Sequence, residues 1–515
     1  MTLKPIIDST DTNEKRLFAS FFIFFTLLHL FLICTTRLYP FLDISNHLAL
    51  ATIYKYYGLS GNQFEHYYAL DLFPKPNVFH MLFCGSKIFS SVEFANTIYY
   101  CLYAVLFPFS VLGIIKKLGG NCWFALLSFL LLYNLNVTYG FAGFTLALPC
   151  ILFVVYFILD DFKTSSARAK LAVMALLIAL FFMHALAAVF ALLLYALYGA
   201  YISRHSLQNA AKALLAIMPS LVLIMLWWLN DTAEFKGDDL LTALYAYYKN
   251  SYVHTLFLRA GFLIHDNFRI DGGVRGYCAA LFFSIVIIGS AVVTLFANKK
   301  TFSTTIKKTS FAIAALFSAC TLTCVLFFPD TMPGYSFLFE RFSVLFMVSL
   351  ILLGSMFACA PMLSSLKVCI VISCFVHFFV WADCFHDFNK ENNGFDKTFF
   401  SENQTCATMA ALMYDYRFRN ISVYDNFLDY YIVWNQGIAA TRSIDERSFP
   451  VKRKVPRDLL PPYLEWVGKY NNYDGRYNNT DCILVRGDIP LSQKIYLKAF
   501  TLLKSAGKWA LYKKM

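Results

Sequence analysis

The sequence predicts a mainly α-helical, polytopic membrane protein that carries a small α/β or α+β domain at its C-terminal end. The 515-residue chain is 58% hydrophobic and 18% aromatic but only 15% charged, whereas about a quarter of the residues of soluble domains are charged. Long apolar runs fill residues 17–383, and residues 384–515 have ordinary mixed polarity. We therefore expect a transmembrane domain, residues 1–383, and a C-terminal domain, residues 384–515.

The first apolar run, residues 17–35, is predicted to be a retained signal-anchor helix. It follows Lys15-Arg16, and no small-residue cleavage pattern precedes Arg37. A helix of this length spans ~28 Å, close to the ~30 Å thickness of the hydrocarbon core.

Ten further apolar runs bring the number of candidate spans to eleven. Residues 78–90 are too few to cross the bilayer, so we expect a re-entrant or interfacial helix there. Residues 171–202 are too many for one helix, so we expect a tight hairpin that turns near His184. These two regions make the prediction eleven to thirteen spans. The further runs are residues 94–115, 122–133, 141–159, 171–183, 185–202, 212–230, 277–297, 309–328, 341–360 and 368–383.

Basic residues in the short loops predict the orientation of the chain. One assignment places all of these loops in the cytoplasm together with the N-terminus, as expected of a protein of the bacterial inner membrane. The outer face then receives the loops at residues 37–93 and 231–276 and the whole C-terminal domain. The basic loop residues are Lys116, Lys117, Lys163, Arg168, Lys170, Arg204, Lys212, Lys299, Lys300, Lys307, Lys308 and Lys367.

The net charge of +12, from 44 Lys and Arg against 32 Asp and Glu, is dispersed over these loops, so we expect no nucleic-acid partner. Eleven of the 14 cysteines lie in or beside apolar runs and behave as small hydrophobic residues. Cys384, Cys406 and Cys482 belong to the C-terminal domain, where they permit at most one internal disulfide, as suits an oxidising compartment.

Short β-rich stretches predict strands in the C-terminal domain at residues 421–424, 431–434, 482–485 and 509–512. Residues 491–503 are predicted to form a helix, and three prolines interrupt the pattern within residues 456–464.

The first outer loop contains the most promising chemical pattern. Asp43 and His47 are four residues apart, so they lie on one face of a short helix directly after the first span. An aspartate at this place can act as a general base, bind a metal or accept a hydrogen bond from a substrate hydroxyl. The alternative is that Asp43 only caps the helix that begins after Pro40.

This layout resembles the GT-C superfamily, polytopic glycosyltransferases that include the protein O-mannosyltransferases and the lipid A aminoarabinose transferases. In particular, Asp43-Ile-Ser-Asn-His47-Leu-Ala is similar to the Asp-x-Pro-x-His-Leu-Ala of uncharacterised bacterial members, although the proline is absent. The tail from Phe500 to Tyr512 is also similar. The resemblance implies a lipid-phosphate-linked sugar as donor, Asp43 as base or metal ligand, and His47 as its neighbour. Many members carry paired acidic residues, and Asp71 and Glu65 are the candidates for a second carboxylate.

Displacement of a lipid phosphate from a sugar requires cations or hydrogen-bond donors near the leaving group. His265, Arg269 and Arg275 lie just before a span, and Glu340-Arg341 opens another. The alternatives are a solvated loop whose Arg275 meets lipid headgroups, and an interfacial charge pair at 340–341.

His184 interrupts an apolar stretch, where it is either a buried structural histidine or a residue that faces the same cavity as Asp43.

We therefore expect a membrane glycosyltransferase that moves a sugar from a polyprenyl-phosphate donor to an acceptor hydroxyl of a glycan, lipid or protein on the outer face. No metal-binding motif or phosphate-binding Gly-rich loop is present, so no cofactor is predicted, although a divalent cation stays open. The alternatives are a lipid or polysaccharide transporter or flippase, and a catalytically silent scaffold of the same architecture.

Overall fold

The computed structural model describes a helical bundle with a strand-containing C-terminal region. The described residues are 11–71, 73–164, 166–203, 207–231, 256–297, 309–332, 335–358, 364–401, 406–439, 449–456 and 475–515, with residues 242, 245, 246, 249, 305, 441 and 444. Several predicted features lie outside these residues: most of residues 232–255 of the predicted outer loop 231–276, Arg204, the lysine pairs at 299–300 and 307–308, and most of the proline-containing segment 456–464.

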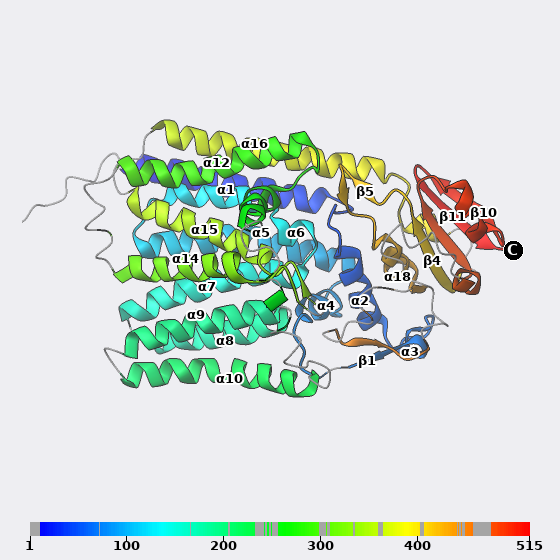
Figure 1. The fold of residues 1–515 in the computed structure, drawn as a ribbon, viewed down its shortest axis with the longest axis horizontal. Helices are drawn as coiled ribbons and strands as arrows, with labels where there is room; N and C mark the ends of the chain where they lie inside the picture. The colour runs from blue at the N-terminus through cyan, green and yellow to red at the C-terminus, as the bar shows by residue number, and fades with distance from the viewer. Residues whose placement is uncertain are drawn as a thin grey trace, which may run out of the picture.

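Each of the eleven predicted runs is found as a helix. Eight of the described helices are long and apolar enough to cross a membrane, namely α1, α5, α7, α10, α12, α14, α15 and α16. Figure 1 shows the helices packed side by side in one bundle. Their bounds are α1 (Asp11–Thr35), α5 (Val92–Leu118), the 3-10 helix η1 (Cys122–Leu131), α7 (Ala142–Thr164), α8 (Ala167–Met183), α9 (Ala185–Ser203), α10 (Leu207–Asp231), α12 (Val274–Ala297), α14 (Thr309–Phe327), α15 (Glu340–Phe357) and α16 (Ser364–Glu391).

The long helix α5 begins and ends where its local sequence dictates. The Ser91 side chain accepts a hydrogen bond from the backbone N–H of Phe94, which caps the first turn. Gly119 then ends the helix with a left-handed backbone at φ 71°, a conformation that glycine adopts without steric cost. Lys116 and Lys117 occupy the last turn, where positive charge is favourable.

The two ambiguous regions have the expected structures. Within residues 78–90, α4 (Phe79–Cys84) is too short to cross a bilayer, and Val78 donates a backbone hydrogen bond to Phe182 near the end of α8. The backbone at His184 is extended, with φ −166° and ψ 123°, and it separates α8 from α9. The predicted break at His184 is therefore confirmed.

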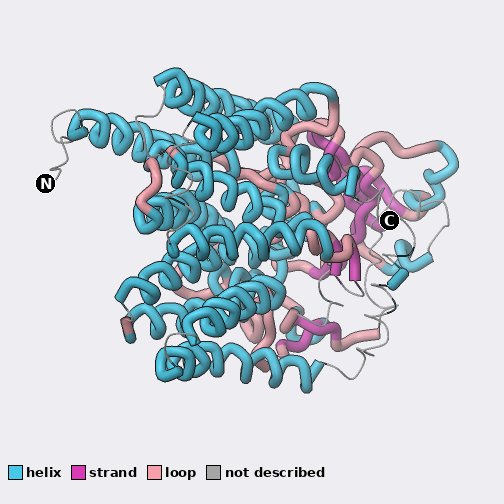
Figure 2. Tube along the Cα trace, turned by 60° about the vertical axis from the view of Figure 1, so that its left-hand side comes forward, coloured by secondary structure: helices cyan, strands magenta, loops and turns pink. Residues whose placement is uncertain are grey.

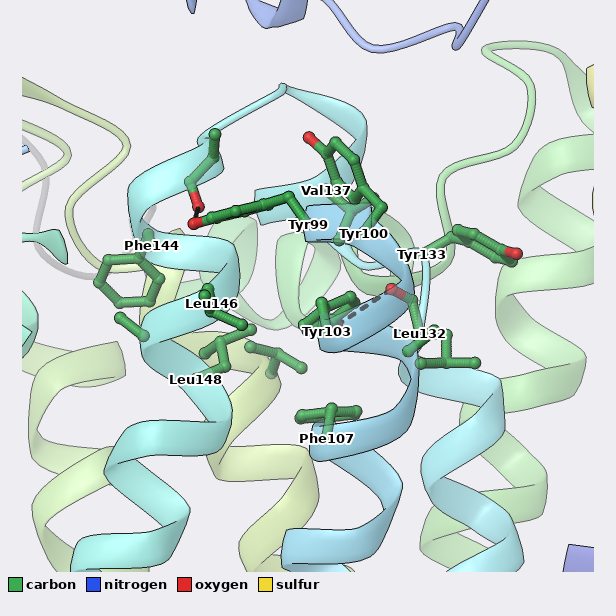
Figure 3. Packing of buried hydrophobic residues seen from close by; sticks show 14 of the residues in the cluster. Tyr99, Tyr100, Tyr103, Phe107, Leu132, Tyr133, Val137, Phe144, Leu146 and Leu148 are labelled. Atoms are coloured by element: carbon green, nitrogen blue, oxygen red, sulfur yellow. Dashed lines mark hydrogen bonds between the residues drawn. The ribbon is translucent and has the colours of Figure 1, made fainter. Parts of the chain in front are cut away.

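The buried aromatic residues of α5 join it to its neighbours (Figure 3). The Tyr99 hydroxyl donates to the carbonyl of Ala142 at 2.7 Å, and the Tyr103 hydroxyl donates to that of Leu132 at 3.0 Å. Each hydroxyl reaches a carbonyl at the end of another helix, so the tyrosines add polar contacts to the buried aromatic surface.

The first outer loop and the C-terminal region lie at the same end of the bundle, away from the N-terminus (Figures 1 and 2). The loop forms α2 (Ile44–Tyr56), α3 (Phe64–Tyr67) and β1 (Tyr68–Leu70). Strand β1 pairs antiparallel with β8 (Val451–Arg453), so Tyr68 lies opposite Arg453. At the other end, Glu14 pairs with Lys367 and Asp160 pairs with Lys117. The described basic loops thus lie opposite the predicted outer loop.

A five-stranded mixed sheet forms the C-terminal region, in the order β10-β11-β9-β4-β7. Cys406, just before β4, forms a disulfide with Cys482 at the start of β9, which fits the prediction of one internal bridge. Helix α16 continues past the predicted boundary at residue 383 and holds the sheet through an ion pair between Glu391 and Arg486. The strands are β4 (Thr408–Met413), β7 (Ile438–Ala439), β9 (Cys482–Arg486), β10 (Phe500–Ala506) and β11 (Trp509–Lys514).

Two secondary-structure predictions in this region are wrong. Residues 431–434 belong to helix α18 (Tyr430–Asn435), because a short apolar run that is buried all round looks the same in a strand and in a buried helical turn. The predicted helix at 491–503 is only the 3-10 helix η9 (Leu491–Leu497), after which β10 begins. Strands at 482–485 and 509–512 are confirmed, and the strand at 421–424 is reduced to β6 (Ile421–Ser422).

Candidate functional site

Most of helix α2 is buried, and its two candidate residues lie in a partly exposed stretch at its start. Every residue from Ile44 to Ile53 is buried apart from His47, and Asp43 directly before the helix is also partly exposed. The four-residue spacing puts both side chains on one face. The open face at the start of this helix therefore consists of one carboxylate and one imidazole, while residues 54–56 are partly exposed at its other end.

The Asp43 carboxylate is held by the C-terminal region. Asp43 occupies the N-cap position of α2 but makes no side-chain capping hydrogen bond. Instead, Nδ2 of Asn426 donates to Oδ1 of Asp43 at 2.8 Å. Asn426 is only 2% exposed, and its carbonyl accepts from the Ser45 hydroxyl at 2.8 Å. Helix capping thus does not account for the Asp43 side chain.

The second carboxylate near Asp43 is Asp429. It ends the 3-10 helix η4 (Phe427–Asp429), which begins one residue after Asn426. Asp429 is 1% exposed, and its Oδ2 has no hydrogen-bond partner among the described residues. Burial raises the pKa of the Asp429 carboxyl well above its ordinary value, and the charge of Asp43 raises it further. The raised pKa favours the neutral form of the Asp429 carboxyl.

Asp71 and Glu65, the predicted candidates for a second carboxylate near Asp43, have other surroundings. Asp71 forms an ion pair with Lys75, with 2.6 Å between Oδ2 and Nζ, and accepts the backbone N–H of Phe73. The Glu65 carboxylate lies against Gly58, 3.1 Å from the position of a Cβ atom there. The expectation that Asp71 is a site residue gains no support, because its carboxylate serves this local ion pair.

The imidazole ring of His47 lies close to two other aromatic rings. Its ring centroid lies 5.5 Å from that of His80 and 5.8 Å from that of Phe449. Desolvation, together with the nearby His80 and Arg341, lowers the pKa of His47 to about 3. His47 is therefore a neutral imidazole at physiological pH, with a hydrogen-bond donor and an acceptor.

Arg341 and His184 meet beside His47. Nη1 of Arg341 lies 3.1 Å from Nε2 of His184, and the guanidinium carbon is 3.7 Å from the ring centroid of Phe141. Nη2 of Arg341 donates to the carbonyl of Ser336. His184 thus has the partner that a histidine in an apolar stretch requires, and this partner is a cation near His47.

A short turn links these groups to the transmembrane helices. Helix α6 (Leu135–Thr138) is followed by Tyr139 and Gly140, and the backbone N–H of Asp43 donates to the carbonyl of Tyr139 at 3.0 Å. Gly140 has φ 75°, and a Cβ atom there would lie 2.8 Å from the Asp43 nitrogen. Only glycine allows this close approach without strain. The sequence pattern gave no sign that this turn organises the site.

Arg269 reaches the same turn from the segment before α12. Its Nη1 donates to the Tyr139 hydroxyl at 3.0 Å, and it forms no ion pair among the described residues. His265 is occupied otherwise, because its Nδ1 lies 3.0 Å from Oδ1 of Asp266 and its ring stacks on Tyr277. Arg269 is thus the member of this segment that remains available to an anion.

Glu340 and Arg275 have different surroundings. Glu340 is 2% exposed, with an Oε2 that has no hydrogen-bond partner among the described residues. It interacts electrostatically with Arg259 and with Tyr139. Arg275 is exposed in the first turn of α12, in agreement with the headgroup alternative. The structure thus brings together Asp43, His47, His184 and Arg341, with Arg269 joined through Tyr139.

Among the described residues, no group of three or more His, Cys, Asp and Glu side chains is placed to hold a metal ion. The chain has no match among protein-family models, curated proteins or solved structures.

Proposed function

We propose that this chain is a GT-C-like membrane glycosyltransferase, which moves a sugar from a polyprenyl-phosphate donor to an acceptor hydroxyl at the outer face. The observation that carries the proposal is the open face of α2. Asp43 and His47 are partly exposed where the neighbouring residues of the helix are buried, and Arg341 lies near His47. A carboxylate and a guanidinium at one end of an apolar bundle provide a base for the acceptor and a cation for the leaving phosphate.

The proposed reaction is a single displacement. The acceptor oxygen attacks the anomeric carbon and gives its proton to the Asp43 carboxylate. The bond between the anomeric carbon and the phosphate oxygen breaks, and its electron pair leaves with the polyprenyl phosphate. Arg341 and Arg269 stabilise the charge that develops there. Because attack and departure occur on opposite sides of the carbon, the product has inverted configuration.

The local contacts suit this role of Asp43. The amide of Asn426 orients the carboxylate and favours its charged form, as a hydrogen bond donated to an anion does. Burial favours the neutral form of Asp429, so we assign the role of base to Asp43. The neutral His47 is left to hydrogen-bond a sugar or acceptor hydroxyl.

The proposed orientation has the N-terminus in the cytoplasm, eleven to thirteen spans and the site on the outer side. The disulfide between Cys406 and Cys482 supports an oxidising compartment for the C-terminal region. The described basic loops at the opposite end support a cytoplasmic location for that end.

The test is sugar transfer by the full chain in proteoliposomes that contain polyprenyl-phosphate-linked sugars, measured as release of polyprenyl phosphate. We expect Asp43→Asn to lower the rate at least a hundredfold, since a general base contributes about 10² to 10⁴. Asp71→Asn is the matched control and should stay within about twofold, because the Asp71 carboxylate is held in an ion pair with Lys75. A thermal melt shows that this variant is folded. Equal activity of the two variants would overturn the role of Asp43. If the wild type translocates lipid but releases no sugar, and Asp43→Asn loses this translocation, a flippase is favoured instead.

A further inference from the structure

A cavity of about 200 Å³ lies between α9 and α10, in the part of these helices that is remote from His184. Five of the eight residues that line it are alanine or glycine, which leave space where larger side chains would interlock, and the others are Tyr195, Leu214 and Ile217. The residues that matter here are Tyr195, Ala196, Gly199, Ala200, Ala210 and Ala213. Gly199 is close enough to α10 that a Cβ atom there would lie 3.6 Å from Cβ of Ala213, so the helices touch at this level and the cavity lies beside the contact.

The cavity opens on the apolar periphery of the bundle. Ala196 and Ala200 are exposed, and large apolar residues flank the opening, among them Leu197 on α9 and Leu214 and Leu215 on α10. Helix α10 has the lowest buried share of the eight candidate spans, 22%. A hollow with such a rim contacts hydrocarbon, and an apolar hollow does not retain water.

One wall of the cavity carries a polar atom without a partner. Tyr195 is 1% exposed, and its hydroxyl makes no hydrogen bond among the described residues. The neighbouring Tyr198 hydroxyl does have a partner, since it donates to Oδ2 of Asp161 at 3.2 Å. A buried hydroxyl next to an empty apolar volume therefore requires an acceptor that arrives with an apolar ligand.

The charged groups nearby give the depth of this hydroxyl. Asp161 near the end of α7 pairs with Lys170 in the first turn of α8, and such a pair lies near the polar boundary of a bilayer. Tyr198 contacts that pair, and the Tyr195 ring lies 5.7 Å from the Tyr198 ring. The ester groups of a phospholipid occupy the region directly below its headgroup, within reach of this level.

We infer that the cavity between α9 and α10 binds one acyl chain of an anionic glycerophospholipid, with the Tyr195 hydroxyl donating to an ester carbonyl. Lys212 is exposed on α10 next to Ala213 and supplies the positive charge for the headgroup. This site is independent of the proposed sugar transfer, because it lies at the opposite end of the bundle from Asp43.

The test is native mass spectrometry of the full chain in mild detergent, titrated with phosphatidylglycerol or with phosphatidylethanolamine. We expect one tightly retained phosphatidylglycerol and at least tenfold weaker retention of phosphatidylethanolamine. Ala210→Leu and Ala196→Leu each fill the cavity and should reduce binding at least tenfold. Tyr195→Phe should reduce it about fivefold, the equivalent of one net hydrogen bond.

Ala211→Leu is the matched control, because Ala211 is exposed next to Ala210 and does not line the cavity. It should bind phosphatidylglycerol as the wild type does, and a thermal melt of each variant shows that it is folded. Unchanged binding by either folded cavity-filling variant would overturn the site, as would equal binding by Tyr195→Phe and the wild type. Equal retention of the two lipids would overturn the anionic specificity.

Discussion

The contact between Asn426 and Asp43 allows a quantitative test of whether the C-terminal region builds the site. The perturbation is a double-mutant cycle of Asn426→Ala and Asp43→Ala. A hydrogen bond to a charged group contributes about 1.5–3 kcal/mol when it is buried. Here the donor is buried and the acceptor is partly exposed, so water can replace part of the interaction. We therefore expect a coupling energy of about 1–2 kcal/mol.

The assay is reversible unfolding in mixed micelles with increasing SDS, followed by tryptophan fluorescence. Asn389→Ala combined with Asp43→Ala is the matched control cycle. Asn389 also ties the first loop to a later part of the chain, through hydrogen bonds with the backbone of Leu38 at 3.0 Å in each direction. That control should be additive within about 0.5 kcal/mol. A coupling below about 0.5 kcal/mol between Asn426 and Asp43 would refute the proposed contact.

Three further predictions concern the same end of the bundle. In the same unfolding assay, Gly140→Ala should lower the stability of the fold by more than Gly119→Ala. Both variants place alanine in a left-handed backbone, which costs about 1–2 kcal/mol, but only the Cβ atom at position 140 also clashes with its neighbours. Equal losses of stability would contradict this. Asp429→Asn should flatten the dependence of the unfolding free energy on pH. The pKa of Asp429 is higher in the folded than in the unfolded state, so the stability of the wild type falls as the pH rises above about 4. Equal slopes of unfolding free energy against pH in the two proteins would contradict the raised pKa. Peptide mapping without reductant should recover Cys406 linked to Cys482, and two free thiols would contradict the bridge.

Much of the membrane fold could be predicted because length and apolarity identify spans one at a time. His184 was visible as a polar interruption, and extended backbone is what separates two helices there. Asp43 and His47 could be paired because helical spacing is local information. The residues that complete their surroundings could not be paired with them, because Asn426 and Asp429 lie far along the chain and only the folded structure brings them near.

Some signals were present in the sequence and were not used. Asp429 is a lone acid within the apolar run Phe427-Leu-Asp-Tyr-Tyr-Ile432, and an isolated charge in such a run indicates a special environment. Lys75 follows Asp71 by four residues, the spacing of a local ion pair, and this pair explains why Asp71 is not part of the site. Short apolar stretches such as residues 431–434 carry no information that separates a strand from a buried helical turn.

The pairing of β1 with β8 has a consequence for biosynthesis. Tyr68 emerges from the ribosome early, yet its strand partner Arg453 is made only after the last transmembrane helix has been inserted. Until then the first loop holds an unpaired edge and an Asp43 without its amide donor. The protein therefore passes through synthesis with an incomplete site, and under the proposed function sugar transfer can start only once the C-terminal region has folded against the first loop.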